Sequence, residues 1–463
     1  MRRHPSDAEL ARFLRAEDEL PRDGWVTDHL LEGCVRCLLA LQRLLVEAHR
    51  EGRQDLRLSA APGNAREQRR LFRRVVDRLA RVSWLQQTEE AVAPALLAEL
   101  ARLPRAERLE IVRQEPRYHL LGFARHLTAR CREEAFGDVA QALDLGELAV
   151  AAAESLDSRV YLPWGVDEAR ALAEGALGNA NRVARELPAA ERWLRLARGH
   201  AGAPRGDAMV QAELLSLMGS LRIDQARFRQ AEAVLEEALR HARALEGEEL
   251  RAKLLLQLSH AVGENGRPAD AVALLEEAMP LVDAHLPTHL QLRARQNLAW
   301  WLVDAGRAQE GEAVYQFIRT PLHDSLQGLK RLHVNWLGAR VLRGQGKLDE
   351  ANEELQQIQE AFGESGAWYD YALVALDRAA LLLEQGRTAE VRRLAAEILP
   401  AFTSRELHRH ALAALALFQR AATAERATAA WVRDLGRYLR HARSDASLRF
   451  PGPPDPAAAG GGS

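Results

Sequence analysis

The sequence has few aromatic residues, almost no lysine and little that is typical of β-structure. Aromatic side chains make up 5% of the 463 residues although 47% are hydrophobic, so Leu, Ala and Val supply most of the apolar content. Runs rich in Val, Ile, Thr and Tyr, which favour strands, are missing. Leu, Ala, Arg and Glu dominate instead, and all four are strong helix formers. The composition therefore predicts an all-α protein long enough to bury a large core.

Neither sign of charge is in excess. The formal net charge is −2 at pH 7, which argues against a globally basic nucleic-acid-binding protein. Nearly all the positive charge is arginine, because lysine occurs only as Lys253, Lys330 and Lys347. The basic amphipathic helix expected at residues 66–79 lacks the interleaved aromatic side chains that stack on bases. We interpret it as a solvated face and do not expect a nucleic-acid partner.

Long apolar runs and common enzyme motifs are also missing. No stretch approaches the roughly 18 uninterrupted apolar residues that a membrane-spanning helix needs. The opening residues, Met1 to Asp7, lack the apolar segment of a signal peptide, so we expect a cytoplasmic protein with no membrane partner. A Gly-rich phosphate loop, G-x-S-x-G, H-E-x-x-H and supported carboxylate pairs are absent from the sequence. It therefore predicts no catalytic residues.

A short phrase recurs every forty residues. Its glycines are Gly266, Gly306, Gly346 and Gly386, and drifted copies occur at residues 226, 426 and 185. Each glycine is expected to end a helix, since a left-handed cap carries no steric penalty without a Cβ, and a second helix starts just after it. A small residue seven positions before each glycine predicts a close approach of the two helices: Ser259, Ala299, Ala339 and Ala379.

This order of small residue, glycine turn, small residue and apolar stripe resembles the tetratricopeptide repeat (TPR) family. The resemblance covers about residues 165–440, or six to seven units, although the period is forty rather than thirty-four residues. It implies a right-handed superhelical α-solenoid with a concave groove, lined by the first helix of each pair. Residues 64–160 are expected to form a helical connector with a degenerate repeat. The Pro- and Gly-rich residues 450–463 are expected to be a disordered tail.

Aligning the repeats by their glycines places a polar stripe on the expected groove face. Its members are Lys253, Gln257, His260, Arg293, Asn297, Trp300, His333, Trp336, Arg340 and Asp377. One interpretation is a protein- or peptide-binding concavity, with Trp300, Trp336 and the arginines as anchors. The alternative is an ordinary solvated groove whose tryptophans fill the gaps between repeats.

The first fifty residues carry a separate chemical pattern. Three cysteines, Cys34, Cys37 and Cys131, are too few for a disulfide framework. Cys131 is expected to be a buried thiol, whereas Cys34 and Cys37 form a C-x-x-C at the start of an apolar helix, where their thiolate forms are favoured. His29 is a candidate third ligand. His4, ahead of the capping box Ser6-Asp-Ala-Glu9, is the candidate fourth ligand of a structural Zn²⁺.

Residues 1–50 resemble the zinc-binding anti-sigma domain, in which a Cys or His is followed about twenty-five residues later by His and Cys-x-x-Cys. One extra residue, Gly33, lies between His29 and Cys34, and it either loosens the turn or displaces His29. The open alternatives are a redox disulfide between the two cysteines, two unrelated buried thiols, and a solvated His4. A catalytic zinc is disfavoured, because no general base accompanies the pattern.

Together these patterns predict a cytoplasmic, bacterial-type regulatory adaptor that is not an enzyme. The TPR groove would bind a protein or peptide. The resemblance of residues 1–50 implies that the zinc domain contacts a partner, plausibly an alternative sigma factor, and so acts in transcription regulation. The runner-up is a pure interaction scaffold whose zinc site is only structural. An enzyme is the third hypothesis.

Overall fold

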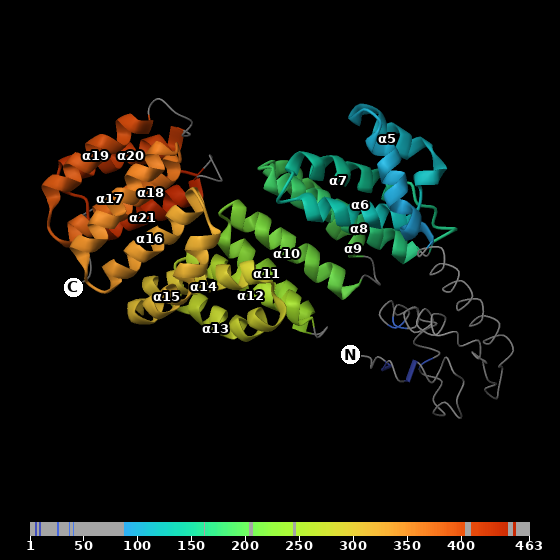
Figure 1. Cartoon of the computed structure of the whole chain (residues 1–463), viewed down its shortest axis with the longest axis horizontal. Helices are drawn as coiled ribbons and strands as arrows, with labels where there is room; N and C mark the ends of the chain where they lie inside the picture. The colour runs from blue at the N-terminus through green and yellow to red at the C-terminus, as the bar shows by residue number, and fades with distance from the viewer. Residues whose placement is uncertain are drawn as a thin grey trace, which may run out of the picture. The chain divides into compact units, whose positions relative to one another are not determined.

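The computed structural model describes residues 88–450 apart from short gaps at 162, 203–206, 244–246, 403–408 and 443–447, together with a few isolated positions nearer the N-terminus. Throughout this part of the chain the secondary structure is helical, and no strand occurs in it. The chain divides into two compact units, Met1–Met218 and Gly219–Ser463 (Figure 1). The prediction of an all-α, TPR-type α-solenoid is confirmed. None of the described helices is both long enough and apolar enough to cross a membrane.

The first unit is built from antiparallel helices that pack through small side chains. Residues 88–101 are helical. The elements that follow are α5 (Arg105–Gln114), η1 (Pro116–Tyr118), α6 (Leu121–Glu134), α7 (Val139–Glu154), α8 (Pro163–Val183), α9 (Leu187–Ala201) and α10 (Ala208–Asp224), whose last turns belong to the second unit. Helix α7 buries the alanine-rich residues 149–153. A Cβ at Gly146 would lie 3.0 Å from Leu177 Cδ1 of α8 and 3.2 Å from Cys131 Sγ of α6, so glycine favours the close approach of α7 to both helices.

Two predictions about single residues can be checked in the described part of the chain. Cys131 is fully buried, as predicted, and burial raises the pKa of its thiol to about 11. Near the N-terminus, the backbone N–H of Ser6 donates to Glu9 Oε2 at 2.7 Å, and the N–H of Glu9 donates to Ser6 Oγ at 3.3 Å. These two bonds form the predicted capping box, and Leu10 beyond it is buried.

The second unit repeats a helix pair. Its helices are α11 (Phe228–Arg243), α12 (Glu248–Glu264), α13 (Pro268–His285), α14 (Thr288–Asp304), α15 (Ala308–Ser325), α16 (Leu329–Gly344), α17 (Leu348–Glu364), α18 (Trp368–Glu384), α19 (Thr388–Phe402), α20 (Arg409–Thr423) and α21 (Ala429–Ala442). We call α12, α14, α16 and α18 the first helices of their pairs. The small residues Ser259, Ala299, Ala339 and Ala379 on them are at most 1% exposed, so the predicted close approaches are confirmed.

The repeat turns share one backbone geometry. Gly266, Gly306, Gly346 and Gly386 have φ between +70° and +86°, and after each of them the next N–H bonds back to a carbonyl five residues earlier, as Arg267 N does to Val262 O at 3.2 Å. This is the glycine cap that the sequence predicts. The drifted copies use non-glycine residues at positive φ, namely Arg185 and Ala226 as predicted. The last copy was predicted one residue too late, because the left-handed residue is Glu425 rather than Arg426.

The last helix departs from the pattern. Helix α21 has little contact with α20 and packs chiefly along α18; in Figure 1 it lies beside α18 within the second unit. At its far end, His441 Nε2 lies 3.1 Å from Glu264 Oε2 on α12. Phe450, the first residue of the predicted tail, packs on Tyr438 with ring centroids 5.2 Å apart. The remainder of that tail lies outside the described residues.

Candidate functional site

The predicted polar stripe lies on the first helices and divides into two halves. The half on α16 and α18, joined by Trp300 of α14, is held by contacts between repeats. The half on α12 and the rest of α14 is more exposed. Both halves belong to the second unit.

Arg340 of α16 is the centre of the first half. Its guanidinium donates to Asp377 Oδ2 on α18 at 2.9 Å, pairs with Asp304 on α14, and lies 4.1 Å from the ring centroid of Trp300. Its side chain is only 11% exposed. Burial opposes the charge of Arg340, but Asp304 and Asp377 outweigh it and raise the arginine pKa above its ordinary value. One arginine therefore ties three consecutive first helices together.

The aromatic residues of this half support the same contact. Trp336 is 3% exposed, and its Nε1–H donates to Asp377 Oδ2 at 2.8 Å. Trp300 meets Trp336 edge to face with centroids 5.6 Å apart. Burial works to raise the pKa of Asp377, yet Arg340, Arg343 and Arg440 lower it overall. Trp336 thus fills a gap between repeats, as in the alternative interpretation of the stripe, while Trp300 stays half-exposed.

His333 links the same two helices nearer their N-terminal ends. Its Nδ1 lies 2.7 Å from the carbonyl oxygen of Leu329, and its Nε2 lies 3.2 Å from Oδ1 of Asp370. Asp370 is buried. The imidazole also meets Phe362 edge to face. His333 is therefore part of the packing between α16, α17 and α18.

The more exposed half contains the remaining stripe residues. Lys253 pairs with Glu249 on its own helix at 2.6 Å, and the amide of Gln257 donates to Ser220 Oγ at 2.8 Å. Burial, above all, lowers the pKa of His260 below its ordinary value. Arg293 is exposed and Asn297 half-buried, and within the described residues neither makes a hydrogen bond or ion pair.

A cleft of about 570 Å³ lies beside the stripe, between the last turns of the first helices and one face of α21. We call it the charged cleft. Its acidic and basic lining residues are Glu264, Asp304, Asp377, Glu384, Asp434, Arg340, Arg343, Arg433, Arg437 and Arg440. Only Arg340 and Asp377 of this set were predicted.

The acidic residues that were not predicted share one position in their repeats. Asp224, Glu264, Asp304 and Glu384 each stand two residues before a repeat turn and end their helices. Carboxylates at helix C-termini are unfavourable, because the helix dipole places partial negative charge there. An acid that recurs at this position therefore indicates a cationic partner. For Glu264, Asp304 and Glu384 the partner is an arginine of α16 or α21.

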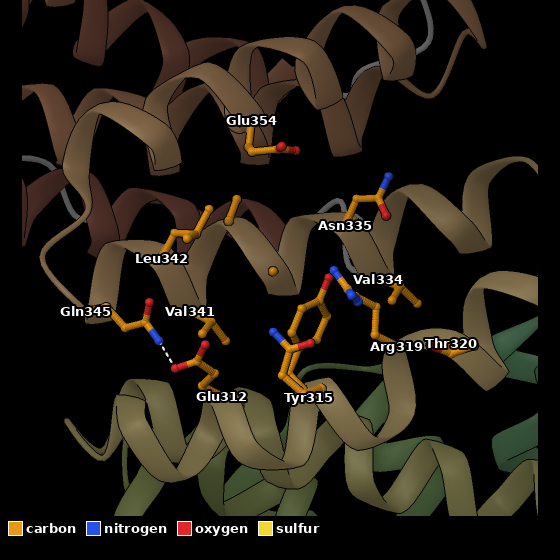
Figure 2. Close-up of a pocket in the computed structure, with 13 residues that line it drawn as sticks. Glu312, Tyr315, Arg319, Thr320, Val334, Asn335, Val341, Leu342, Gln345 and Glu354 are labelled. Carbon is orange, nitrogen blue, oxygen red and sulfur yellow. Dashed lines mark hydrogen bonds between the residues drawn. The ribbon is translucent and has the colours of Figure 1, made fainter.

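A second cleft, of about 550 Å³, lies between α15, α16 and α17. Figure 2 shows Tyr315 and Arg319 reaching into it from α15 and Glu354 facing them from α17. The amide of Gln345 donates to Glu312 at one end. A Cβ at Gly338 would lie 2.5 Å from the hydroxyl oxygen of Tyr315, so glycine makes room for the phenol. Its mixed lining does not indicate one ligand class.

Most of the predicted metal ligands cannot be placed. His4, His29 and Cys34 lie outside the described residues, while Cys37 is helical and 1% exposed. Among the residues that are described, no group of three or more His, Cys, Asp or Glu side chains is arranged to hold a metal ion. A site made of two imidazoles and two thiolates would suit Zn²⁺. The zinc site stays a prediction from the sequence.

No family model matches this sequence, and no curated protein matches it. Similar solved structures exist. A Rap protein complexed with Competence and Sporulation Factor is 11% identical, with 70% of this chain and 94% of that chain covered at a TM-score of 0.50. The aspartyl phosphate phosphatase F of Bacillus subtilis is 10% identical, with 87% and 96% covered at a TM-score of 0.46. PilF of Pseudomonas aeruginosa is 17% identical, with 52% and 93% covered at a TM-score of 0.36. At these identities the likeness concerns the fold, which is that of a TPR-type α-solenoid.

Proposed function

We propose that this protein is a non-enzymatic regulatory adaptor that binds a protein or peptide segment along the polar stripe of its first helices. The observation that carries the proposal is the contrast within the stripe. Arg340, Asp377 and the two tryptophans form a fixed platform, and beside it Arg293 and Asn297 are left to meet a ligand. The anchors are already ordered by their own contacts, which favours binding, because only the unengaged polar groups lose side-chain freedom when a ligand binds.

The chemistry of the exposed half indicates the ligand. Arg293 presents five N–H donors and Asn297 presents both donors and an acceptor, and Lys253 adds a second positive charge on α12. These groups suit a segment that carries carboxylates or backbone carbonyls. The Rap structure of similar fold is a complex with Competence and Sporulation Factor, and a ligand of the same broad kind, a protein or peptide, is proposed for this chain.

The test is selection of a phage-displayed random peptide library on the full-length protein, followed by titration of the enriched peptides. We expect enrichment of acidic peptides, and a loss of roughly tenfold or more in affinity for Arg293→Glu. The matched control is Arg229→Glu, an exposed arginine on α11, which should leave binding unchanged. Peptides that bind both variants and wild type equally would show that the stripe is not the binding surface.

For residues 1–50 we propose a structural Zn²⁺ held by His4, His29, Cys34 and Cys37, and contact with an alternative sigma factor. The donor chemistry, the Ser6–Glu9 capping box and the burial of Cys37 support the zinc site. Metal analysis should find about one zinc per chain, lost in Cys34→Ala and kept in the control Cys131→Ala. If a sigma factor from the same organism is neither captured by the wild type nor inhibited in transcription assays, the scaffold alternative is preferred.

A further inference from the structure

The placement of α21 differs from that of α13, α15 and α17, the second helices of the inner repeats. Helices α13, α15 and α17 each pack on the first helix of their own pair, whereas α21 leaves α20 and lies along α18. Its C-terminal end reaches α12 and the neighbouring α11. The ring centroids of His441 and of Phe228 on α11 lie 4.5 Å apart. Helix α21 therefore covers the last turns of helices that are up to four repeats away in sequence.

One face of α21 is apolar and fully docked. Trp431, Leu435 and Leu439 recur at helical spacing, and each is at most 5% exposed. They belong to the same core as Leu373, Leu376 and Ala380 of α18. As a result, α18 is buried on two sides. One side is covered by α21 and corresponds to the groove side of the other first helices, and the other side packs within its own repeat.

The other face of α21 is basic and meets the acidic helix ends. Arg433 pairs with Glu384 at 2.6 Å, and the same carboxylate accepts from Arg343 at 2.5 Å. At the far end, Arg440 lies 3.7 Å and His441 3.1 Å from Glu264. Burial alone would raise the pKa of Glu264, but Arg440 and the neighbouring histidines His441 and His260 hold it well below its ordinary value. Two of the acidic positions that recur along the repeats, Glu264 and Glu384, are thus paired with arginines of one helix.

We propose that the acidic ends of the first helices form a binding site for a basic amphipathic helix, and that α21 is its resident, displaceable occupant. A partner helix with apolar residues at the spacing of Trp431, Leu435 and Leu439, and arginines at the spacing of Arg433 and Arg440, competes for this site. The inference rests on the proposed function, in that both use the face of the first helices. The two sites differ in the ligand that they bind. The exposed half of the stripe is basic and suits an acidic segment, whereas the charged cleft offers carboxylates to a basic helix. Binding at the cleft requires α21 to leave, so the chain is autoinhibited.

The first experiment uses a fluorescent synthetic peptide of residues 427–450 as the probe and the full-length protein as the receptor. In wild type the resident helix competes, so the apparent affinity is reduced by the small fraction of open molecules. The double variant Arg433→Glu/Arg440→Glu weakens the resident helix and should bind the probe roughly tenfold or more tightly. The control, Arg229→Glu/Lys347→Glu, reverses two exposed charges outside the cleft and should behave as wild type. Equal binding by all three proteins would overturn the proposal.

A charge swap separates specific recognition from non-specific attraction. In the otherwise unaltered chain, Glu264→Arg/Glu384→Arg repels the arginines of the resident helix. It should abolish binding of the basic probe and allow binding of a probe that carries Arg433→Glu and Arg440→Glu. Failure of the swapped probe to bind, in a protein whose helical circular dichroism matches wild type, contradicts the proposal. Dimers formed by exchange of α21, seen by sedimentation, would assign the site to a second copy and also contradict it.

Hydrogen exchange on the unaltered protein covers the case in which a variant fails to fold. Excess probe should speed the exchange of amides in α21 and leave those of α17 unchanged; no change in α21 would overturn the proposal. Failure of the proposed function is distinguishable, because it is read from Arg293→Glu and acidic peptides. Neither touches the contacts of α21.

Discussion

The inner repeats α12–α17 and the final pair α20–α21 come from the same sequence phrase and end in different packing. In the inner repeats the two helices joined by a repeat turn pack extensively on each other. In the final pair the turn at Glu425 has the same left-handed backbone, yet the two helices it joins hardly touch. A repeat turn therefore fixes where a helix ends and starts, whereas the surface on which the second helix docks is decided by the rest of the fold.

The difference also concerns what holds the helices. Inner pairs meet through fully buried small residues such as Ala299 and Ala339, where any larger side chain would collide. Helix α21 is held by large apolar residues on one face and by ion pairs on the other. On the proposal above, a contact of the second kind opens without rearranging the repeats, because a competing helix takes over both the apolar contacts and the ion pairs.

The largest effect is expected from Asp377→Ala, which breaks the tie between the inner repeats. It leaves the guanidinium of Arg340 buried beside one remaining carboxylate and removes the acceptor of Trp336 Nε1. Loss of one partner of a buried ion pair costs about 3–5 kcal/mol. Urea unfolding followed by tryptophan fluorescence measures it. The control is Asp349→Ala, whose side chain is 84% exposed where it meets Arg387; a similar loss in both would show that burial is irrelevant here.

A second prediction compares Leu355→Ala in α17 with Leu435→Ala in α21. The two leucines lie two forty-residue periods apart in the sequence and are both buried. Truncating either removes about 2–5 kcal/mol of packing. We expect Leu355→Ala to lower the stability of the whole array. Leu435→Ala should chiefly accelerate hydrogen exchange within α21, because that helix opens locally. If both variants speed hydrogen exchange uniformly across the second unit, α21 unfolds together with the array as α17 does, and the prediction that α21 opens locally is wrong.

The smallest effect concerns the turns that both regions share. Gly346→Ala places a Cβ in the left-handed region and should destabilise by about 1 kcal/mol. At the drifted turn, Ala226→Gly should stabilise by about 0.5–1 kcal/mol, since φ there is +55°. Thermal unfolding of the two variants and the wild type measures the sign of each change in stability. A loss of stability in Ala226→Gly would mean that unfolded-chain entropy outweighs relief of the left-handed strain.

Local features were largely predictable from the sequence. The forty-residue register located the turns, because a helix end depends on a few neighbouring residues, and it located the buried small residues such as Ser259 and Ala379. Ala226, a poor residue for its backbone conformation, was found by counting from the glycines, and Arg185 was found as a drifted copy of the same phrase one residue off that count. The miss at Glu425 came from extending the count through a copy that had shifted by one residue.

The site was less predictable because its contacts are non-local. The apolar face of α21 could pack equally well on α20 or on α18, and nothing in residues 429–442 distinguishes the two. The stripe was chosen by helical spacing around the middle of each first helix, so it included Arg340 and Asp377. It stopped short of the last turn, where Glu264 and Glu384 lie. The burial of Trp336 depended on the neighbouring repeat, which spacing alone does not describe.

The bond between α21 and α12 has a mechanical consequence. A solenoid behaves like a spring, in which each repeat can rotate slightly on the next. Helix α21 contacts both α18 and α12, and so limits the rotation of the repeats between them. The second unit should therefore resist stretching until α21 separates from Glu264. Under tension in an optical trap, the unit should extend in two steps. A small early extension marks the detachment of α21 from α12, and a gradual extension of the repeats follows.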